Sequence, residues 1–195
     1  MRFQTLLLLM LGLSVSACTS TPATNFYILA PMATPAETPL KPGTPRLIGL
    51  GPVTLPALLE RKQLVTRSGG NTVHIAELHQ WAEPLKDNFT QTLAKNLATL
   101  RTSDLVKAYP WSAYGDVDYR ILIDVARFDT TPGQSVDLEA HWAIMAEKNH
   151  NLLTSGQAKI SRPLADTSYA GAVNALSAAL AELSQQLAAA LDGVK

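Results

Sequence analysis

This chain of 195 residues has one cysteine, Cys18, which stands directly after a short apolar segment. Arg2 gives the segment a positive start, residues 6–13 form its apolar run, and Val-Ser-Ala at 15–17 comes just before the cysteine. This order is typical of a secretory signal peptide, and the small residues before the cysteine form a bacterial lipobox. We therefore expect residues 1–17 to be removed and the mature chain to begin at a lipid-modified Cys18.

A lipobox cysteine accepts a diacylglyceryl group on its thiolate, and its new amine then receives an acyl chain, usually palmitate. Two or more acyl chains hold a protein on a bilayer essentially permanently. The apolar run itself is too short to cross one, since a spanning helix needs about 20 apolar residues. Thr19 stands where an aspartate would retain a bacterial lipoprotein at the inner membrane. We predict an anchor at the periplasmic face of the outer membrane; the alternative is an ordinary secreted protein whose signal peptide ends near a cysteine.

Charge and cysteine content exclude several classes of protein. The sequence holds 16 basic and 16 acidic residues, so it has no net field to recruit nucleic acid, and we expect no nucleic-acid partner. With Cys18 carrying lipid, no thiol remains for a disulfide, and stability must come from burial of apolar surface. Hydrophobic residues at 47% of the chain make that feasible, and the length suits one domain.

The residues from the cysteine onward predict a tether, a strand and a loop. Residues 18–24 are mostly small and polar and form a lipidated tether. The β-prone stretch 25–29 predicts a first strand, and the prolines between 31 and 45 predict an exposed loop without regular structure. A single domain then spans residues 25–195. The alternative is that 19–45 is all linker.

The rest of the chain predicts two amphipathic helices and several strands. Apolar residues recur every three or four positions from Leu85 to Leu100 and from Tyr169 to Leu191. The first helix is predicted to have Pro84 as its first helical residue, and the second to have Asp166, Thr167 or Ser168 as its cap. Alternating apolar residues and turn residues predict the strands. They are a kinked strand at 47–55, a hairpin formed by 63–67 and 72–77, and a three-stranded meander at 119–125, 136–144 and 152–160. This order favours an α+β fold in which both helices pack on one face of a mostly antiparallel sheet.

The last predicted helix is unusually poor in charge. Between Thr167 and Leu191 the only charged residue is Glu182, and alanines are frequent. One interpretation is an alanine surface that simply favours helix formation. The other is a face that contacts a partner or a second subunit, with Ala178, Ala181 and Glu182 as candidate contact residues.

Motifs for catalysis or metal binding are missing from the sequence. It has no Gly-x-Ser-x-Gly elbow, no phosphate-binding glycine loop and no His-Glu-x-x-His motif, so we expect no catalytic residue, no metal and no enzyme activity. The histidines lack metal-ligand spacing and are interpreted as solvent-facing; they are His74, His79, His141 and His150. Trp81, Trp111 and Trp142 either line an apolar groove for an acyl chain or belong to the core.

Several short motifs point to one family. After the lipobox they are Phe26-Tyr27-x-Leu29, Gly51-Pro52-Val53, Leu59-x-Arg61, Val65-x-Arg67, Trp81-Ala82-Glu83-Pro84-Leu85 and Tyr109-Pro110-Trp111. With these motifs the chain resembles the PqiC family of ABC-type transport auxiliary lipoproteins over nearly all of the mature sequence. The block from Trp81 to Leu85 and the Val65-x-Arg67 strand are the most specific part of the resemblance.

The resemblance implies a role in transport rather than catalysis. Such proteins are outer-membrane lipoproteins that partner MCE-domain proteins in systems that move lipids between the inner and outer membranes. The chain is then expected to dock the periplasm-spanning MCE component at the outer membrane and to support membrane integrity, with a ring of identical subunits as one arrangement. Arg67 and Trp81 are further candidate contact residues. The alternative function is a periplasmic lipid carrier, which needs a deep apolar cavity.

Overall fold

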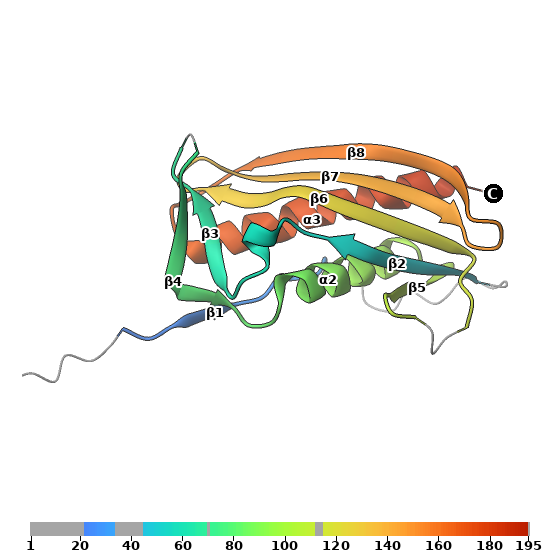
Figure 1. Cartoon of the computed structure of the whole chain (residues 1–195), viewed down its shortest axis with the longest axis horizontal. Helices are drawn as coiled ribbons and strands as arrows, with labels where there is room; N and C mark the ends of the chain where they lie inside the picture. Colours follow the sequence, from blue (N-terminus) through green and yellow to red (C-terminus); the bar gives the residue numbers. More distant parts are fainter. Residues whose placement is uncertain (1–21, 34–44, 70, 112–114, 195) are drawn as a thin grey trace, which may run out of the picture.

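The computed structural model describes residues 22–33, 45–69, 71–111 and 115–194 (Figure 1). The predicted signal peptide and the lipid attachment site Cys18 lie outside the described residues, as do most of the tether predicted at 18–24 and of the loop predicted at 31–45. Within the described ranges, no helix combines the length and the apolar character needed to cross a membrane.

One sheet of eight strands forms the framework, with β6 (Tyr119–Thr131) at its centre. On one side β6 pairs antiparallel with β7 (Ser135–Ala146), which pairs antiparallel with β8 (Asn151–Pro163). On the other side the first half of β6 pairs parallel with β2 (Arg46–Thr54), and its end meets β3 (Gln63–Arg67). The sheet therefore forks along β6 into two branches (Figure 1).

Each branch ends in a short parallel edge strand. In one branch β3 forms a hairpin with β4 (Val73–Trp81), and β1 (Asn25–Tyr27) pairs parallel with the end of β4. In the other branch β5 (Asp104–Ala108) pairs parallel with β2, and the short helix η2 (Ala57–Leu59) joins β2 to β3. The sheet is mixed, and most of its paired residues belong to the three antiparallel ladders.

Two helices cover one face of this sheet, as the sequence predicted. Helix α2 (Leu85–Leu100) packs against β2 and β5, and α3 (Tyr169–Asp192) runs along β6, β7 and β8 (Figure 1). The two helices also pack against each other. The α+β fold expected from the sequence is confirmed.

Helix α2 buries one apolar stripe and starts at a proline. Pro84 is its N-cap rather than its first helical residue, and the φ angle of proline suits this start. The stripe is fully buried over Leu85, Phe89, Leu93 and Leu97, and the Phe89 ring meets Phe128 of β6 edge-on at 5.2 Å between centroids. Leu100, predicted for the same stripe, is 37% exposed because it ends the helix, where the core no longer reaches.

Helix α3 begins at one of the three predicted cap residues and ends at the predicted glycine. Its N-cap is Ser168, whose hydroxyl oxygen accepts a hydrogen bond from the Gly171 N–H at 2.9 Å, and Gly193 follows its last turn. Its buried face is wide, because the sheet covers one side of the helix and α2 covers another. That face includes Val173, Leu176, Leu180, Leu183, Leu187 and Leu191.

The N-terminal half of the sheet contains the predicted first strand and one strand that was not predicted. The strand predicted at 25–29 is present as β1 over residues 25–27, so the interpretation of 19–45 as all linker is wrong for them. Strand β5 was not predicted, because its buried first position holds the charged Asp104 while the next residue, Leu105, is apolar and exposed. The kink predicted in β2 is confirmed: the register on β6 shifts between Leu50 and Val53, and Gly51 has a φ of 122°.

A buried ion-pair network around Asp104 joins β5 to the C-terminal end of α3. Both Arg46 and Arg101 donate to the Asp104 carboxylate, Arg46 at 2.9 Å. Arg101 also donates to the Ala188 carbonyl oxygen at 2.8 Å and to the Asp192 carboxylate at 2.7 Å. Because a buried charge is costly unless it is paired, this network fixes the end of α3 against the edge of the sheet.

The network lowers the pKa of one carboxyl group. Burial alone would raise the pKa of Asp104, but the hydrogen bonds from Arg46 and Arg101 hold it below its usual value. A carboxylate with a depressed folded-state pKa stabilises the fold above its unfolded-state pKa of about 3.9. This contribution is lost as the pH falls through the lower pKa of the folded state.

Substitution of Asp104→Asn leaves the buried Arg101 guanidinium without its buried carboxylate. We expect the free energy of unfolding at neutral pH to fall by about 2–4 kcal/mol, somewhat less than a fully buried pair costs because Arg46 is partly exposed. The loss of stability below about pH 4 should also become shallower. Urea unfolding of both proteins over the acid range measures these effects.

The control is Glu182→Gln, which weakens the exposed pair between Arg162 and Glu182 at 2.9 Å. Exposed pairs contribute little, so this change should cost less than about 1 kcal/mol. Equal losses from the two substitutions would contradict the role assigned to Asp104.

Candidate functional site: a cleft beside the N-terminal strand

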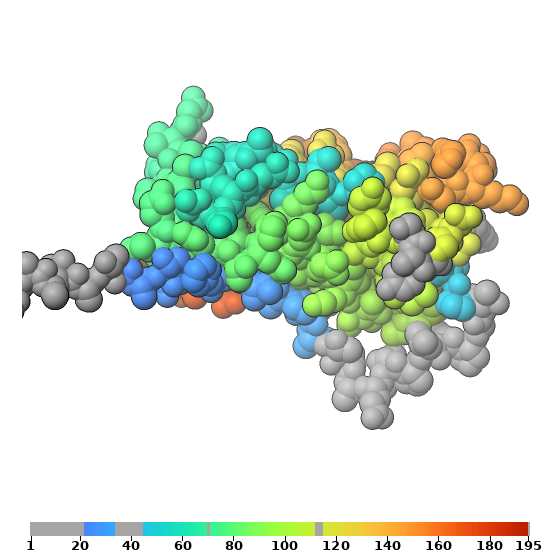
Figure 2. All heavy atoms as spheres, turned by 60° about the horizontal axis from the view of Figure 1, so that its bottom comes forward, coloured from blue at the N-terminus to red at the C-terminus, as the bar shows by residue number. Residues whose placement is uncertain are grey.

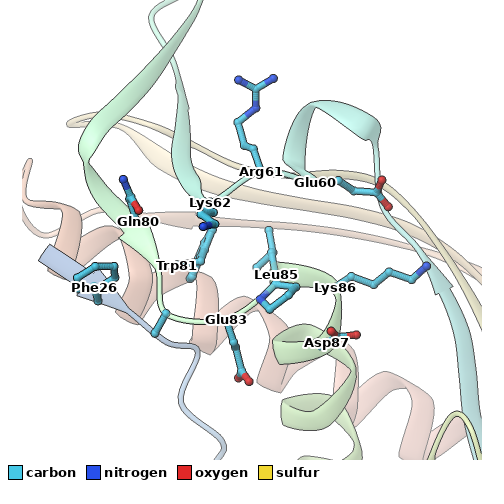
Figure 3. A pocket seen from close by; sticks show the side chains of 12 residues that line it. Phe26, Glu60, Arg61, Lys62, Gln80, Trp81, Glu83, Leu85, Lys86 and Asp87 are labelled. Atoms are coloured by element: carbon cyan, nitrogen blue, oxygen red, sulfur yellow. The ribbon is translucent and has the colours of Figure 1, made fainter. Parts of the chain in front are cut away.

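A cleft of about 580 Å³ lies where β1, the start of β3 and the first turn of α2 meet (Figure 3). We call it the N-terminal cleft. Its apolar lining comes from Phe26, Trp81, Ala82, Pro84 and Leu85. Its polar lining comes from the residues before β3, the end of β4 and the start of α2, namely Glu60, Arg61, Lys62, Gln80, Glu83, Lys86 and Asp87.

Backbone hydrogen bonds hold the walls of the cleft together at the end of β4. The Trp81 N–H donates to the Lys62 carbonyl oxygen at 2.7 Å, and the Ala82 N–H donates to the Tyr27 carbonyl oxygen at 2.8 Å. The chain then passes through Pro84 into α2. The block from Trp81 to Leu85, which carries the most specific part of the family resemblance, therefore forms the centre of this cleft.

The cleft combines an apolar floor with a rim of mixed charge. Its rim has three basic and three acidic side chains, so it carries no net charge. Glu83 accepts a hydrogen bond from the Asn88 amide at 2.6 Å, and Arg61 donates to the Leu58 carbonyl oxygen at 2.9 Å. Figure 3 shows the Arg61 and Glu83 side chains extending to opposite sides of the cleft. Such a site suits an apolar group flanked by polar contacts.

The contact residues predicted from the sequence do not meet at one place. Trp81 is buried and lines the cleft. Arg67 lies at the opposite end of the β3–β4 hairpin and pairs with the buried Asp129 of β6 at 2.6 Å. Ala178, Ala181 and Glu182 are half-buried on α3. Phe26 and Lys62 of the cleft were not among the predicted residues, although Phe26 lies in a quoted family motif.

The three tryptophans occupy separate places, so they do not form one groove. Trp81 lines the N-terminal cleft. Trp111 covers Gly49 of β2, where an added Cβ would stand 3.0 Å from its ring. Trp142 covers Gly156 of β8, where an added Cβ would stand 2.5 Å from its ring. Trp111 and Trp142 therefore cover the sheet at places where glycine leaves room for an indole.

One histidine is not solvent-facing, contrary to the sequence prediction. His79 of β4 is half-buried, its Nδ1 lies 2.7 Å from the Tyr27 hydroxyl, and its ring stacks on Tyr169 at 3.9 Å between centroids. Burial, with a smaller contribution from Tyr169, raises the pKa of Tyr27. These rings join β1, β4 and the start of α3. Among the residues that the structure describes, no cluster of histidine and acidic side chains could hold a metal ion.

Polar side chains from both helices hold the extended segment that follows β1. We call them the helix clamp: Asn88, Thr92 and Asn96 of α2, and Ser177 and Ser184 of α3. The Asn88 side chain accepts from the Leu29 N–H at 2.7 Å, and the Asn96 side chain accepts from the Met32 N–H at 2.7 Å. The Ser177 hydroxyl oxygen accepts from the Ala30 N–H at 3.1 Å.

The helix clamp also joins the two helices and reaches the cleft. The Asn96 amide donates to the Ser184 hydroxyl oxygen at 3.0 Å, so it bonds α3 and the extended segment together. Asn88 bonds Leu29 on one side and Glu83 of the cleft on the other. The segment that follows β1 is therefore attached to the core and to the cleft.

Comparisons with known proteins identify the family and the fold. The family model for the ABC-type transport auxiliary lipoprotein component matches residues 27–188. The crystal structure of an uncharacterized protein superposes with a TM-score of 0.73 at 19% identity, covering 87% of this chain and 99% of the other. A protein from Xanthomonas campestris gives a TM-score of 0.66 at 17% identity, covering 85% and 93%. A comparison with curated protein sequences gave no match.

Substitution of Asn96→Ala tests the helix clamp. It removes the acceptor of the Met32 N–H and the donor to Ser184 in a fully buried position. We expect the free energy of unfolding to fall by about 2–3 kcal/mol, and amide hydrogen exchange at Leu29, Ala30 and Met32 to become about tenfold faster. Thr99→Ala is the control, because the Thr99 hydroxyl bonds only the Lys95 carbonyl of its own helix. Unchanged exchange in the Asn96 variant would contradict the clamp.

Proposed function

Since the chain belongs to the family of ABC-type transport auxiliary lipoproteins, we propose that it is the outer-membrane subunit of an intermembrane lipid transport system. In this role lipid on Cys18 anchors the domain at the periplasmic face of the outer membrane. The domain docks the periplasm-spanning MCE-domain component of the same system at that membrane. Loss of the docked state would weaken membrane integrity. The role is one of attachment, and it needs no catalytic residue.

The observation that carries this proposal is the composition and position of the N-terminal cleft. The family-specific block from Trp81 to Leu85 lines it, together with Phe26 of β1. Only a short stretch of chain separates Phe26 from Cys18, so a partner bound in the cleft would be held close to the membrane. An apolar floor with charged groups around it is the composition that protein interfaces use at their centres and rims.

The helix clamp supports the same role, because a partner docked on an anchored protein exerts force on the tether. Force on the extended segment is transmitted to both helices through the hydrogen bonds of Asn88, Asn96 and Ser177. Strand β1 alone pairs over only three residues. The clamp therefore gives the anchor a firm attachment to the domain core.

A lipid carrier is the second candidate function. The cleft volume of about 580 Å³ lies within the range of small-molecule sites, and most of the surface that its walls expose is apolar. Phospholipid that co-purifies with the protein through detergent exchange, and is lost on a cleft substitution, would favour the carrier over the docking subunit.

Affinity capture of the tagged, lipidated protein from detergent-solubilised envelope tests the docking role. We expect an MCE-domain protein among the captured proteins. Reversing two exposed cleft charges, with Lys62→Glu and Lys86→Glu together, should lower its recovery by about five- to tenfold, because rim charges steer association. Lys159→Glu, an equally exposed reversal on β8, should leave recovery unchanged.

Two outcomes of this capture separate the parts of the proposal. With Cys18→Ser the protein should remain folded but leave the outer-membrane fraction, as the lipid anchor predicts. Absence of any MCE-domain protein from the capture, with the lipoprotein intact in the outer membrane, would refute the docking role.

A ring of identical subunits that uses α3 predicts a separate result. Ala178→Glu or Ala181→Glu places a charge on the half-buried face of α3 and should shift the protein from oligomer to monomer while its circular dichroism stays native. Gln91→Glu, on the exposed face of α2, is the control. Light scattering coupled to size-exclusion chromatography measures the mass. A wild-type protein that stays monomeric at high concentration and with its MCE partner would refute the ring, and unfolded variants would show that this face is core.

A further inference from the structure

The extended N-terminal segment presents a row of two large apolar side chains to solvent. Phe26 is 64% exposed and Ile28 is 57% exposed, whereas Tyr27 and Leu29 between and after them point inward. The alternation follows from extended backbone, in which successive side chains point to opposite faces. Figure 2 shows this segment, in blue, at the surface of the molecule. We call Phe26 and Ile28 the apolar row.

The row belongs to an edge of the sheet that nothing covers among the described residues. Strand β1 pairs only with β4, so its other side has no neighbouring strand in the described part of the chain. The helix clamp holds the segment from within through the N–H groups of Leu29 and Ala30. The inward side chains are thus fixed, and Phe26 and Ile28 keep their outward direction.

The length of the tether places this row next to the bilayer. Phe26 follows the predicted lipid site Cys18 by eight residues, which span at most about 28 Å when fully extended. Acyl chains on Cys18 lie in the membrane, so the apolar row can never be farther than this from the headgroups. A tether this short gives the bilayer surface a high effective concentration at the row, and even weak contacts then form.

The charges beside the row suit the surface of a phospholipid bilayer. Phe26 lines the N-terminal cleft, whose rim carries Arg61, Lys62 and Lys86 together with Glu60, Glu83 and Asp87. Lys62 and Lys86 are exposed, and their ammonium groups can meet lipid phosphates. Among the acidic residues of the rim, Glu83 already accepts a hydrogen bond from the Asn88 side chain. The balanced rim matches zwitterionic headgroups, which carry both a phosphate and an ammonium group.

We infer that the apolar row is a second membrane contact, in which Phe26 and Ile28 enter the interfacial region of the phospholipid bilayer beside the lipid anchor. This inference rests on the anchor at Cys18 in the proposed function. The row and the acyl chains together fix the orientation of the domain, because two points of contact prevent it from tumbling on its tether. The N-terminal cleft then opens at the bilayer surface, where a docked transport component delivers or collects lipid.

The test places a fluorophore in the row and reads its depth. The lipidated protein carrying Phe26→Trp is reconstituted into vesicles of phosphatidylethanolamine and phosphatidylglycerol that contain lipid brominated on its acyl chains. Bromine quenches tryptophan fluorescence only at short range. We therefore expect the emission of the added tryptophan at residue 26 to be at least about twofold weaker in the brominated vesicles than in vesicles without bromine. The wild-type protein supplies the background of its three native tryptophans.

Leu152→Trp is the matched control. Leu152 is 60% exposed and begins β8, at the end of the molecule remote from β1 (Figure 1). Its added tryptophan should not be quenched. Both variants replace an exposed apolar side chain with another, so both should fold, and their unfolding midpoints check this.

The outcomes separate the row from the anchor. Quenching at residue 26 and none at residue 152 supports the second contact. Equal quenching at both positions, or none at either while the protein still floats with the vesicles, overturns it and leaves the lipid anchor intact. Protein that fails to float refutes the anchor, and the inference falls with it. A blue shift at residue 26 only on addition of the MCE partner also overturns the inference, since the edge would then receive a strand of that protein.

Discussion

The arrangement of this protein depends on one requirement, that a buried or half-buried backbone amide must find an acceptor. The segment from Ile28 to Met32 is extended but lies outside any strand, so no ladder supplies its hydrogen bonds. Side chains of α2 and α3 supply them instead, through Asn88, Ser177 and Asn96. The two helices therefore need polar residues at positions that face each other, such as Asn96 and Ser184.

The side chains that meet this requirement connect the N-terminal segment to the two helices, which the sheet alone would leave separate. The clamp ties the N-terminal segment to both helices, and the network around Asp104 ties the far end of α3 to β2 and β5. Between these two points α3 is fully buried along its leucine stripe. The N-terminal cleft thus stands on a rigid support even though β1 itself is short.

The sequence was sufficient for features that arise from repeated patterns. The leucine stripe of α3, a cap within residues 166–168 and the β6–β7–β8 meander each follow from periodicity or turn chemistry, and all are present. Features that depend on single polar side chains in the core could not be predicted from the sequence. Asn96 and Asp104 look like solvent-facing residues in the sequence, because their partners Met32 and Arg46 lie more than fifty positions away. The family motif pointed to Trp81 but not to the cleft as a whole, since the lining comes from the open end of the β3–β4 hairpin, from β1 and from the start of α2.

The clamp also sets an order of events during folding. Ala30 bonds Ser177, which follows it by 147 positions, so this bond forms only after almost the whole chain has been made. Until α3 has packed, the segment from Ile28 to Met32 lacks its acceptor on α3. The last helix of the fold therefore decides when the N-terminal segment is fastened, and β1 gains its full support only when folding ends.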